Sequence, residues 1–283
     1  ETDAALFESY KTAQTVPCDL IFGTDPDADR VAIAVPCADG FKKLSGNELG
    51  CLLMEYILKA RTEKNDIPNG AIVVRSIVSS PLADRIAARY GVEMKSVLTG
   101  FKYIGEQIAL LEDKDSADSY LLGFEESYGY LTGSYVRDKD AVDAAFMICE
   151  MFAWYRSKGI SLIDKLDEIY REYGYCLNTL HSFTFEGSAG FAKMQEIMKE
   201  FHKGPEKIGG RNVLKCLDYS KGIDGLPKSD VLKFFLEDNC SVVVRPSGTE
   251  PKLKAYISVS AENKEKAAKA EKQITAQLKE YFC

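Results

Sequence analysis

Three aspartates alternate along a short acidic segment between two apolar runs. Asp25, Asp27 and Asp29 lie between residues 19–23 and 31–35, which are both predicted as strands. Alternate positions in an extended loop can direct carboxylates to one point, where a hard divalent cation such as Mg²⁺ finds the oxygen ligands it prefers. A polar turn of solvated aspartates is the plainer alternative, but three crowded carboxylates repel one another without a cation. We therefore expect these three aspartates to bind Mg²⁺.

The residues around this segment exclude one class of cation site and favour a phosphate-binding one. An EF-hand loop is excluded, because Arg30 stands at the sixth position, where glycine is needed, and Pro36 at the twelfth, where glutamate is needed. The guanidinium fork of Arg30 matches phosphate oxygens, so this residue suits phosphate recognition next to a metal. A local salt bridge from Arg30 to one of the aspartates is the alternative.

A second segment, residues 245–252, has the chemistry of a phosphate cradle. It combines an arginine, two hydroxyls, a glycine and a lysine: Arg245, Ser247, Gly248, Thr249 and Lys252. The glycine lets a ligand approach the backbone closely, and the other groups neutralise or hydrogen-bond an anion. A hairpin turn is the alternative, since Pro-Ser-Gly is good turn chemistry. The segment is not a P-loop, because the GxxxxGK[ST] spacing is absent.

A third segment, residues 123–130, mixes carboxylates, a hydroxyl and aromatic rings between glycines. Glu125 and Ser127 could hold sugar hydroxyls by paired hydrogen bonds, although a plain surface loop fits the local chemistry equally well. Lys102, at a strand-to-helix turn, and Lys139, at a similar position, could each bind an anion. Either lysine could equally be a solvated side chain.

Composition disfavours several other classes of function. The net charge is −7, whereas binding of a nucleic-acid backbone usually needs a basic face. No apolar run approaches the length of a membrane span. The eight cysteines form no CxxC pair, and His181 and His202 lie in no ligand-spaced cluster, so a zinc site is not expected. Scattered cysteines among apolar neighbours indicate reduced core residues and a cytoplasmic protein.

The pattern of elements predicts an α/β chain of two kinds of architecture. Strands and helices alternate from residue 46 to 123, with a capping box at Ser45–Glu48, which favours a mixed, mostly parallel βαβ-type sheet. Ser80 and Pro81 are predicted as the cap and first residue of a helix. After two helices that end near residue 174, the strand-like runs follow one another and predict an α+β domain with an antiparallel sheet.

Four motifs, in this order, resemble the α-D-phosphohexomutase superfamily, of the phosphoglucomutase/phosphomannomutase type. They are TDPDADR at 24–30, TGFK at 99–102, GFEESYGY at 123–130 and RPSGTEPK at 245–252. The resemblance implies that residues 1–45 end a second domain, similar to the next, that residues 46–174 form domain 3, and that residues 175–283 form domain 4. It also implies N-terminal domains absent from this sequence.

The resemblance assigns roles to the candidate residues. Asp25, Asp27 and Asp29 are expected to bind Mg²⁺. Arg30 and Lys102 are expected in the catalytic set. The residues expected to bind substrate are Glu125, Ser127, Lys139, Arg245, Ser247, Gly248 and Thr249. No segment here matches the loop expected to carry the nucleophilic serine, so this chain alone is expected to be inactive.

The implied reaction interconverts a hexose 1-phosphate and a hexose 6-phosphate through a phosphoserine. Glucose 1,6-bisphosphate, or an equivalent hexose bisphosphate, would be the intermediate and activator. A sugar-phosphate binding module without catalysis is one alternative. A haloacid-dehalogenase-type phosphatase is another, although Asp29 stands where that pattern needs Thr or Val. Glucose, mannose and glucosamine stay open as the sugar.

Overall fold

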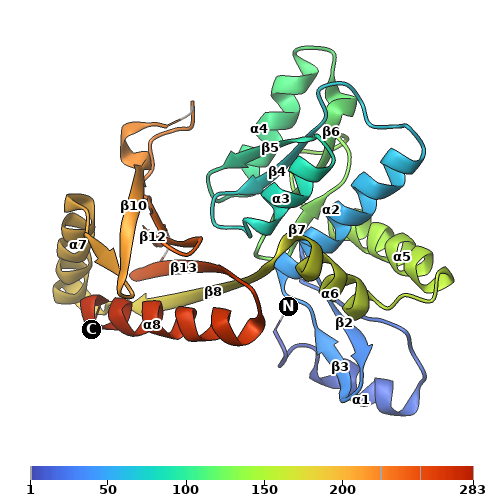
Figure 1. Ribbon diagram of the computed structural model, residues 1–283, viewed down its shortest axis with the longest axis horizontal. Helices are drawn as coiled ribbons and strands as arrows, with labels where there is room; N and C mark the ends of the chain where they lie inside the picture. The colour runs from blue at the N-terminus through green and yellow to red at the C-terminus, as the bar shows by residue number, and fades with distance from the viewer. Residues whose placement is uncertain (1, 224, 249, 283) are drawn as a thin grey trace. The chain divides into compact units, whose positions relative to one another are not determined.

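The computed structural model describes residues 2–223, 225–248 and 250–282. The chain divides into two compact units between Tyr173 and Gly174. Unit 1 runs from blue to yellow-green in Figure 1, and unit 2 runs from gold to red. Each unit has its own sheets and its own buried core.

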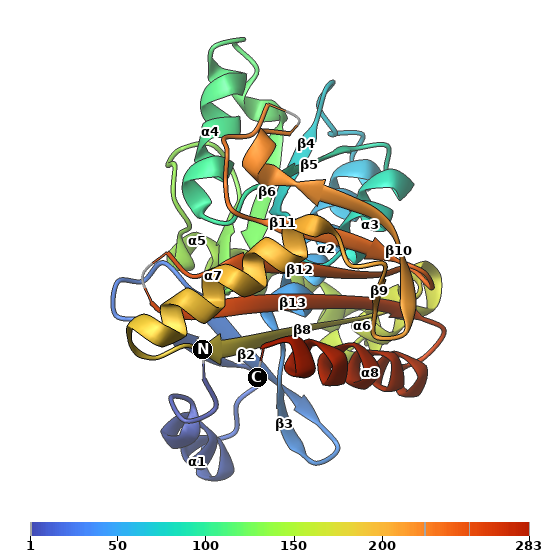
Figure 2. The ribbon, with the colours of Figure 1, turned by 90° about the vertical axis from the view of Figure 1, so that its left-hand side faces the viewer.

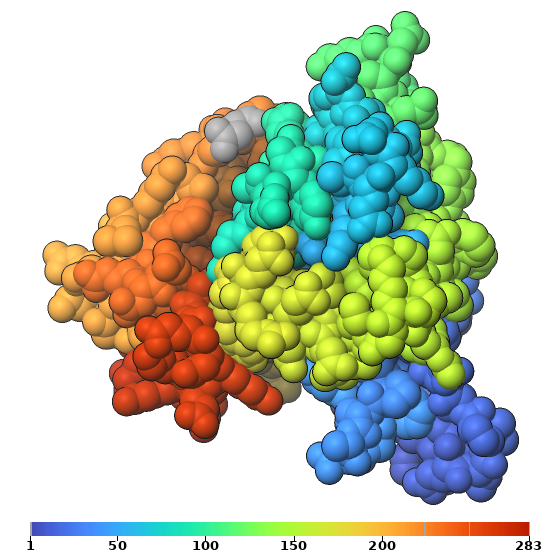
Figure 3. Space-filling model, turned by 45° about the vertical axis from the view of Figure 1, so that its right-hand side comes forward, coloured from blue at the N-terminus to red at the C-terminus, as the bar shows by residue number. Residues whose placement is uncertain are grey.

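The N-terminal lobe of unit 1 is a small antiparallel sheet with one helix. Its elements are α1 (Phe7–Thr15), β1 (Ile21–Thr24), β2 (Val31–Cys37) and β3 (Gly40–Lys43). The central strand β2 is buried along residues 31–35, because it also packs against two later helices of the unit. Figure 3 shows this lobe in blue, next to the yellow-green part of the same unit. Strand β3 was not predicted.

The larger part of unit 1 is a sheet covered by helices on both faces. Its elements are α2 (Gly46–Glu63), β4 (Ile72–Ser76), α3 (Leu82–Arg89), β5 (Glu93–Val97), α4 (Phe101–Glu112), the 3₁₀ turn η1 (Ala117–Ser119), β6 (Tyr120–Glu125), β7 (Gly129–Leu131), α5 (Ala141–Ser157) and α6 (Leu162–Tyr173). The strand order is β5-β4-β6-β7. Strand β4 runs parallel to β5 and β6, and β7 runs antiparallel to β6, which confirms the predicted mixed sheet.

Alternation along β6 explains how helices cover both faces of this sheet. A Cβ on Gly123 would lie 2.4 Å from a side-chain carbon of Ile104 on α4. The ring of the next residue, Phe124, packs against Gly50 of α2 instead. Successive strand residues face opposite sides, so α4 and α2 lie on opposite faces of the sheet. Both glycines are needed because the helices approach closely.

The start of α2 confirms one cap, and the start of α3 corrects another. Ser45 Oγ accepts a hydrogen bond from the Glu48 backbone N–H at 3.3 Å, while Glu48 Oε2 accepts one from the Ser45 N–H at 2.8 Å. Pro81, not Ser80, is the cap of α3, so that prediction was wrong by one residue. Ser80 Oγ still accepts the Leu82 N–H at 3.3 Å, and thus satisfies one free donor of the first turn.

Unit 2 is a six-stranded antiparallel sheet with two long helices on one side. Its elements are β8 (Tyr175–Thr184), α7 (Gly187–Lys203), β9 (Lys207–Ile208), β10 (Arg211–Asp218), the 3₁₀ turn η2 (Tyr219–Lys221), β11 (Leu232–Leu236), β12 (Cys240–Pro246), β13 (Lys252–Ala261) and α8 (Lys264–Phe282). The strand order is β8-β13-β12-β11-β10-β9. Figure 2 shows α7 and α8 on the same side of this sheet, and their apolar faces join the inward residues of the strands in one core. The predicted antiparallel α+β domain is confirmed.

The cysteines are only partly core residues. Among the described residues, Cys51, Cys176 and Cys240 are buried, as expected. Cys18, Cys37, Cys149 and Cys216 are exposed, so the interpretation of these four as core packing was wrong. Within residues 2–223, 225–248 and 250–282, the helices lack the combination of length and apolar character that a membrane crossing requires.

Candidate functional site

The acidic segment between β1 and β2 brings its three aspartates together. One carboxylate oxygen from each of Asp25, Asp27 and Asp29 lies within 4.8 Å of the others. The backbone is a tight turn instead of the extended loop we expected. The Ala28 N–H donates to the Asp25 carbonyl at 3.0 Å, and Ala28 has a φ of 55°. The Asp25 Oδ1 atom closes the turn by accepting the backbone N–H groups of Asp29 at 3.1 Å and Arg30 at 3.0 Å.

The donor set of this turn fits a hard cation. Burial opposes ionisation of Asp25, but the hydrogen bonds from Arg30 and Asp29 outweigh it and lower the pKa of Asp25. Burial, together with the nearby Asp25, raises the pKa of Asp29 even though Lys139 opposes the shift. The Asp29 Oδ1 atom is buried and accepts no hydrogen bond from the described residues. A buried carboxylate oxygen that accepts no hydrogen bond, next to two further carboxylates, is what Mg²⁺ would satisfy.

Two cationic side chains surround the acidic turn. Arg30 Nε lies 3.8 Å from Asp25 Oδ2 and 3.8 Å from Asp29 Oδ1, so the alternative of a local ion pair is also realised. Lys139 Nζ lies 2.5 Å from Asp29 Oδ2, and its side chain is 14% exposed. The Ala141 N–H donates to the Ala28 carbonyl at 3.0 Å, which fixes the start of α5 to the turn. The structure therefore places Arg30 and Lys139 together at the candidate metal site.

The segment at 123–130 is a β-hairpin, in which Glu125 ends β6 and Gly129 begins β7. Glu125 is 5% exposed, and its Oε1 accepts the backbone N–H of Gly100 at 2.7 Å. Burial, and then the charge of Glu126, raise the pKa of Glu125 to about 7. Ser127 lies partly buried in the turn of the hairpin. The buried carboxylate of Glu125 and the hydroxyl of Ser127 are thus separated in sequence by one residue.

Hydrogen bonds and close packing join this hairpin to the acidic turn. The Val31 N–H, directly after the turn, donates to the Tyr128 carbonyl at 3.1 Å. A Cβ on Gly129 would lie 2.5 Å from Cδ of Lys139, so only glycine leaves room for that side chain. The carboxylates of the turn, Lys139 and the hairpin therefore lie next to one another in unit 1.

Lys102 stands apart from this arrangement. It lies in the first turn of α4, is exposed, and places its ammonium group 4.9 Å from the centre of the Tyr103 ring. Within the described part of the chain it makes no ion pair with the acidic turn. Its assignment to the catalytic set stays a prediction.

The phosphate-cradle candidate connects β12 to β13 in unit 2. Arg245 lies near the end of β12, half-buried, and pairs in register with Lys254. The Ser247 N–H donates to the Lys252 carbonyl at 2.7 Å, which closes the connection. A Cβ on Gly248 would meet nothing within 4 Å, so the backbone there is open. Thr249 lies outside the described residues. The loop is at once a hairpin connection and a surface with cationic and hydrogen-bonding groups.

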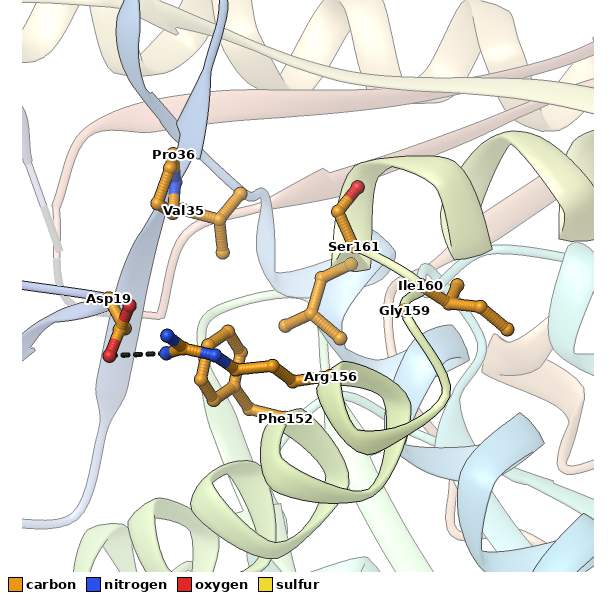
Figure 4. Close-up of a pocket in the computed structure, with 9 residues that line it drawn as sticks. Asp19, Val35, Pro36, Phe152, Arg156, Gly159, Ile160 and Ser161 are labelled. Atoms are coloured by element: carbon orange, nitrogen blue, oxygen red, sulfur yellow. Dashed lines mark ion pairs between the residues drawn. The ribbon is translucent and has the colours of Figure 1, made fainter.

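Two hollows of unit 1 are lined by described residues outside the candidate set. One, of about 310 Å³, lies between β2 and the α5–α6 turn. It is mostly apolar, with Val35 and Phe152 in its wall and an ion pair between Asp19 and Arg156 at its margin (Figure 4). Its arginine is already paired with Asp19, and none of the proposed metal, sugar or phosphate residues lines it.

Sequence reasoning missed the serines that hydrogen-bond to Glu126 in the turn of the hairpin. The carboxylate of Glu126 accepts hydrogen bonds from the hydroxyls of Ser76, the last residue of β4, and Ser79, three residues later. A run of serines directly after an apolar strand was the available signal. It was interpreted only as a helix cap.

The acidic turn yields a direct prediction. Asp27 is the most exposed of the three aspartates, so Asp27→Asn changes the charge with the least effect on the fold of the turn. We expect this variant to bind Mg²⁺ at least about tenfold more weakly in calorimetry, because carboxylate number sets the affinity of oxygen sites. Asp39→Asn, in the exposed β2–β3 turn, is the matched control and should bind as the unaltered chain does. Equal affinity in both variants would exclude Asp27 as a ligand.

Comparison with known proteins places the same segments in one family. Residues 45–173 match a family model described as phosphoglucomutase/phosphomannomutase, alpha/beta/alpha domain III, and residues 186–277 match the C-terminal domain model of the same family. The chain is 37% identical over 276 residues to a phosphoglucomutase of Staphylococcus epidermidis. That match covers 93% of this chain and 49% of the relative, so the chain spans about half the length of the curated protein.

Solved structures share the fold. Parafusin, a phosphoglucomutase from Paramecium in its open form, matches with a TM-score of 0.66 and 21% identity, over 95% of this chain and 45% of its own. An Aspergillus fumigatus N-acetylphosphoglucosamine mutase in complex with GlcNAc-6P and magnesium matches with a TM-score of 0.54 and 13% identity, over 98% and 53%. A variant of the latter enzyme, in complex with glucose 1,6-bisphosphate, has a TM-score of 0.51 and 14% identity, over 98% and 52%.

Proposed function

The chain belongs to the phosphoglucomutase/phosphomannomutase family, and from this premise we propose that it supplies the metal, sugar and phosphate loops of a phosphohexomutase. The substrates would be hexose 1-phosphates and hexose 6-phosphates. The names of similar proteins support this substrate class, since one is a phosphoglucomutase and another was solved with GlcNAc-6P and magnesium. In this proposal residues 1–45 end domain 2, residues 46–174 form domain 3 and residues 175–283 form domain 4.

One observation carries the proposal most strongly. Three carboxylates converge in a turn that is hydrogen-bonded to the hairpin carrying Glu125 and Ser127. A metal-binding turn joined to a sugar-binding hairpin is what a phosphosugar needs, because its phosphate and its hydroxyls must be held at the same time. A loop that bound only a cation would not require a buried carboxylate next to it.

The residues of unit 1 have distinct roles in this proposal. Asp25, Asp27 and Asp29 would hold Mg²⁺, which would neutralise phosphate charge when bound. Arg30 and Lys139 would pair with the oxygens of the reacting phosphate. Such positioning and charge neutralisation are most of what phosphoryl transfer needs from a protein.

The two polar side chains of the hairpin would orient the sugar. Glu125, with its pKa of about 7, can accept a hydrogen bond from a sugar hydroxyl when ionised and donate one when protonated. Ser127 adds a second donor and acceptor. These groups can serve either orientation of the sugar if they contact hydroxyls that exchange places when it turns over.

The phosphate that does not react would bind in unit 2. Arg245, Ser247, Gly248 and Thr249 are the proposed cradle, and its open backbone at Gly248 is compatible with an approaching anion. A separate cradle lets one phosphate stay bound while the other is transferred. Glucose 1,6-bisphosphate, or an equivalent hexose bisphosphate, would be the intermediate between the two monophosphates.

Phosphoryl transfer needs a nucleophile as well as these loops. The family resemblance places that serine in a loop that no segment of the 283 residues matches. We therefore expect the chain to bind hexose phosphates without mutase turnover. The reaction would belong to a protein that also carries the nucleophile loop.

The cradle gives the test of the proposed substrate class. We expect the chain to bind glucose 1-phosphate and glucose 6-phosphate in calorimetric titrations with Mg²⁺ present. The Arg245→Ala/Ser247→Ala variant should lose at least about tenfold in affinity, since each charge-assisted hydrogen bond contributes roughly 1.5–3 kcal/mol. Lys207→Ala with Ser220→Ala, which removes an exposed cation and a hydroxyl elsewhere in unit 2, is the control. Unchanged binding in the cradle variant would remove Arg245 and Ser247 from the proposal.

A further inference from the structure

The carboxylate of Glu126 lies in a small pocket of serine hydroxyls. Its Oε2 accepts from Ser76 Oγ at 2.9 Å and from Ser79 Oγ at 3.2 Å, and the two hydroxyls lie 2.9 Å apart. The Glu126 N–H donates to Ser79 Oγ at 3.2 Å. Both serines are buried, with exposures of 0% and 2%. Two hydroxyl protons serve three short contacts, so the cluster can change its hydrogen-bond pattern without losing its hold on Glu126.

A buried arginine fixes the backbone that carries Ser76 and Ser79. Arg75 is 4% exposed and donates through Nη1 to the carbonyls of Ser76 at 3.0 Å and Ser79 at 3.1 Å. Its other edge forms two bonds to Asp84 on α3, from Nε at 3.3 Å and from Nη2 at 2.6 Å. A planar guanidinium that holds two carbonyls and a carboxylate fixes the turn after β4 against α3.

The geometry of β6 explains why this anchor acts on the candidate sugar residues. Glu126 is the first residue after β6, and different elements hold its side chain and that of Glu125. Glu125 is held from the α4 side by the Gly100 N–H, while Glu126 is held from the α2 and α3 side. A Cβ on Gly46 of α2 would lie 2.2 Å from the Glu126 carbonyl oxygen, so the backbone at Glu126 is also packed tightly. Moving Glu126 therefore moves Glu125 and Ser127 with it.

We propose that Glu126 is a positioning residue for hexose recognition, anchored by Ser76 and Ser79 so that Glu125 and Ser127 face the sugar. The inference rests on the proposed function, because it names how that site is held. Glu126 itself is not expected to touch a reacting atom. It acts through its neighbours on the hairpin.

The anchor also has an electrostatic consequence at the site. After burial, the negative charge of Glu126 is the largest cause that raises the pKa of Glu125. Glu126 thus influences both where Glu125 lies and how much of it is protonated near neutral pH. Removal of the Glu126 charge is expected to lower the pKa of Glu125.

The first experiment compares two ligands of the full chain. Glucose 1-phosphate needs both the hairpin and the phosphate-binding groups, whereas inorganic phosphate needs only the latter. In Ser76→Ala/Ser79→Ala we expect the affinity for glucose 1-phosphate to fall at least about tenfold, because small misplacements of orienting groups have effects of that size. Affinity for inorganic phosphate should change by less than about twofold, since no residue assigned to phosphate is altered. Ser157→Ala, whose hydroxyl caps a carbonyl at the exposed end of α5, is the serine control.

The second experiment separates positioning from general stability. Glu126→Gln keeps the size and the acceptor oxygen but removes the charge. The midpoint of the pH dependence of glucose 1-phosphate binding should shift to lower pH in this variant and stay unchanged in Glu106→Gln, an exposed control on α4. A role confined to folding would not move that midpoint.

The outcomes distinguish the inference from the function on which it rests. If the unaltered chain binds phosphate but not glucose 1-phosphate, the proposed function is wrong and the inference falls with it. If the unaltered chain binds glucose 1-phosphate and Ser76→Ala/Ser79→Ala binds it equally well, only the inference is overturned. Equal loss of both ligands in a folded variant would also overturn it, because the effect would not be specific to the sugar.

Discussion

Replacing Glu55 by alanine is expected to lower the free energy of unfolding of unit 1 by about 3 kcal/mol, because it leaves a buried lysine short of its counter-charge. Glu55 on α2 is 2% exposed, and Lys165 on α6 is 1% exposed. Lys165 Nζ lies 3.2 Å from Glu55 Oε1. The hydroxyls of Tyr90 and Tyr173 each donate to Glu55 at 3.2 Å and would also lose their acceptor. The cluster joins α2, α6 and the end of α3.

Urea denaturation followed by tryptophan fluorescence measures the free energy of unfolding of unit 1. The single tryptophan, Trp154, lies in α5, so its signal reports on unit 1 even if the units unfold separately. The second partner of Lys165 is Glu168 at 3.0 Å, which places the expected loss at the lower end of the range for broken buried pairs.

Two controls separate a buried charge from a lost contact. Glu55→Leu with Lys165→Met removes both charges, and we expect it to cost less than Glu55→Ala alone, since apolar replacement of a buried pair is often close to neutral. Glu8→Ala removes an exposed i,i+3 partner of Lys11 in unit 1 and should change stability by less than about 0.5 kcal/mol. A cost below about 1 kcal/mol for Glu55→Ala would show that Lys165 is not held as described.

Glu125→Gln is expected to stabilise unit 1 at pH 7.5 and to have a much smaller effect at pH 5. Burial and then Glu126 raise the pKa of Glu125 from 4.5 to about 7. Between these two values the folded chain binds more protons at this group than the unfolded chain does, so stability decreases as pH rises. A shift of this size corresponds to about 3 kcal/mol, which is fully lost above pH 7 and regained below pH 4.5.

The variant removes this dependence because glutamine does not titrate. Its Oε1 can still accept the Gly100 N–H, which keeps the local geometry. The difference in unfolding free energy between Glu125→Gln and the unaltered chain should grow by about 2 kcal/mol from pH 5 to pH 7.5. Glu106→Gln, on the exposed face of α4, should show a constant difference across that range. A flat difference for Glu125→Gln as well would mean that Glu125 is ionised in the fold at neutral pH.

Most of the fold could be predicted because its signals are local. The capping box of Ser45 and Glu48 marks the start of α2 by chemistry confined to four residues. The strands with apolar, β-branched sequences were found for the same reason. The short strands β3, β7 and β9 were missed, because two to four residues of mixed polarity form strands only where a neighbour pairs with them. The start of α3 was misplaced because Pro81 accepts either of two adjacent helix positions.

The candidate site, too, could be predicted only where its residues are close in sequence. The aspartates of the acidic turn are close in sequence, so their convergence could be predicted, although the turn that produces it could not. Glu126 and its serines are about fifty residues apart, and no local pattern joins them. The contact between Gly46 and the Glu126 carbonyl likewise depends on where α2 packs. Sequence reasoning found the residues proposed to touch substrate and missed those that hold them.

Backbone amide shifts of the ¹⁵N-labelled chain, titrated with glucose 6-phosphate in the presence of Mg²⁺, test the central claim most directly. We expect the largest shifts in three segments, residues 25–30, 125–128 and 245–248. Shifts confined to other residues, such as those around the hollow beside Asp19 and Arg156, would contradict the assignment of these loops to a phosphohexose site.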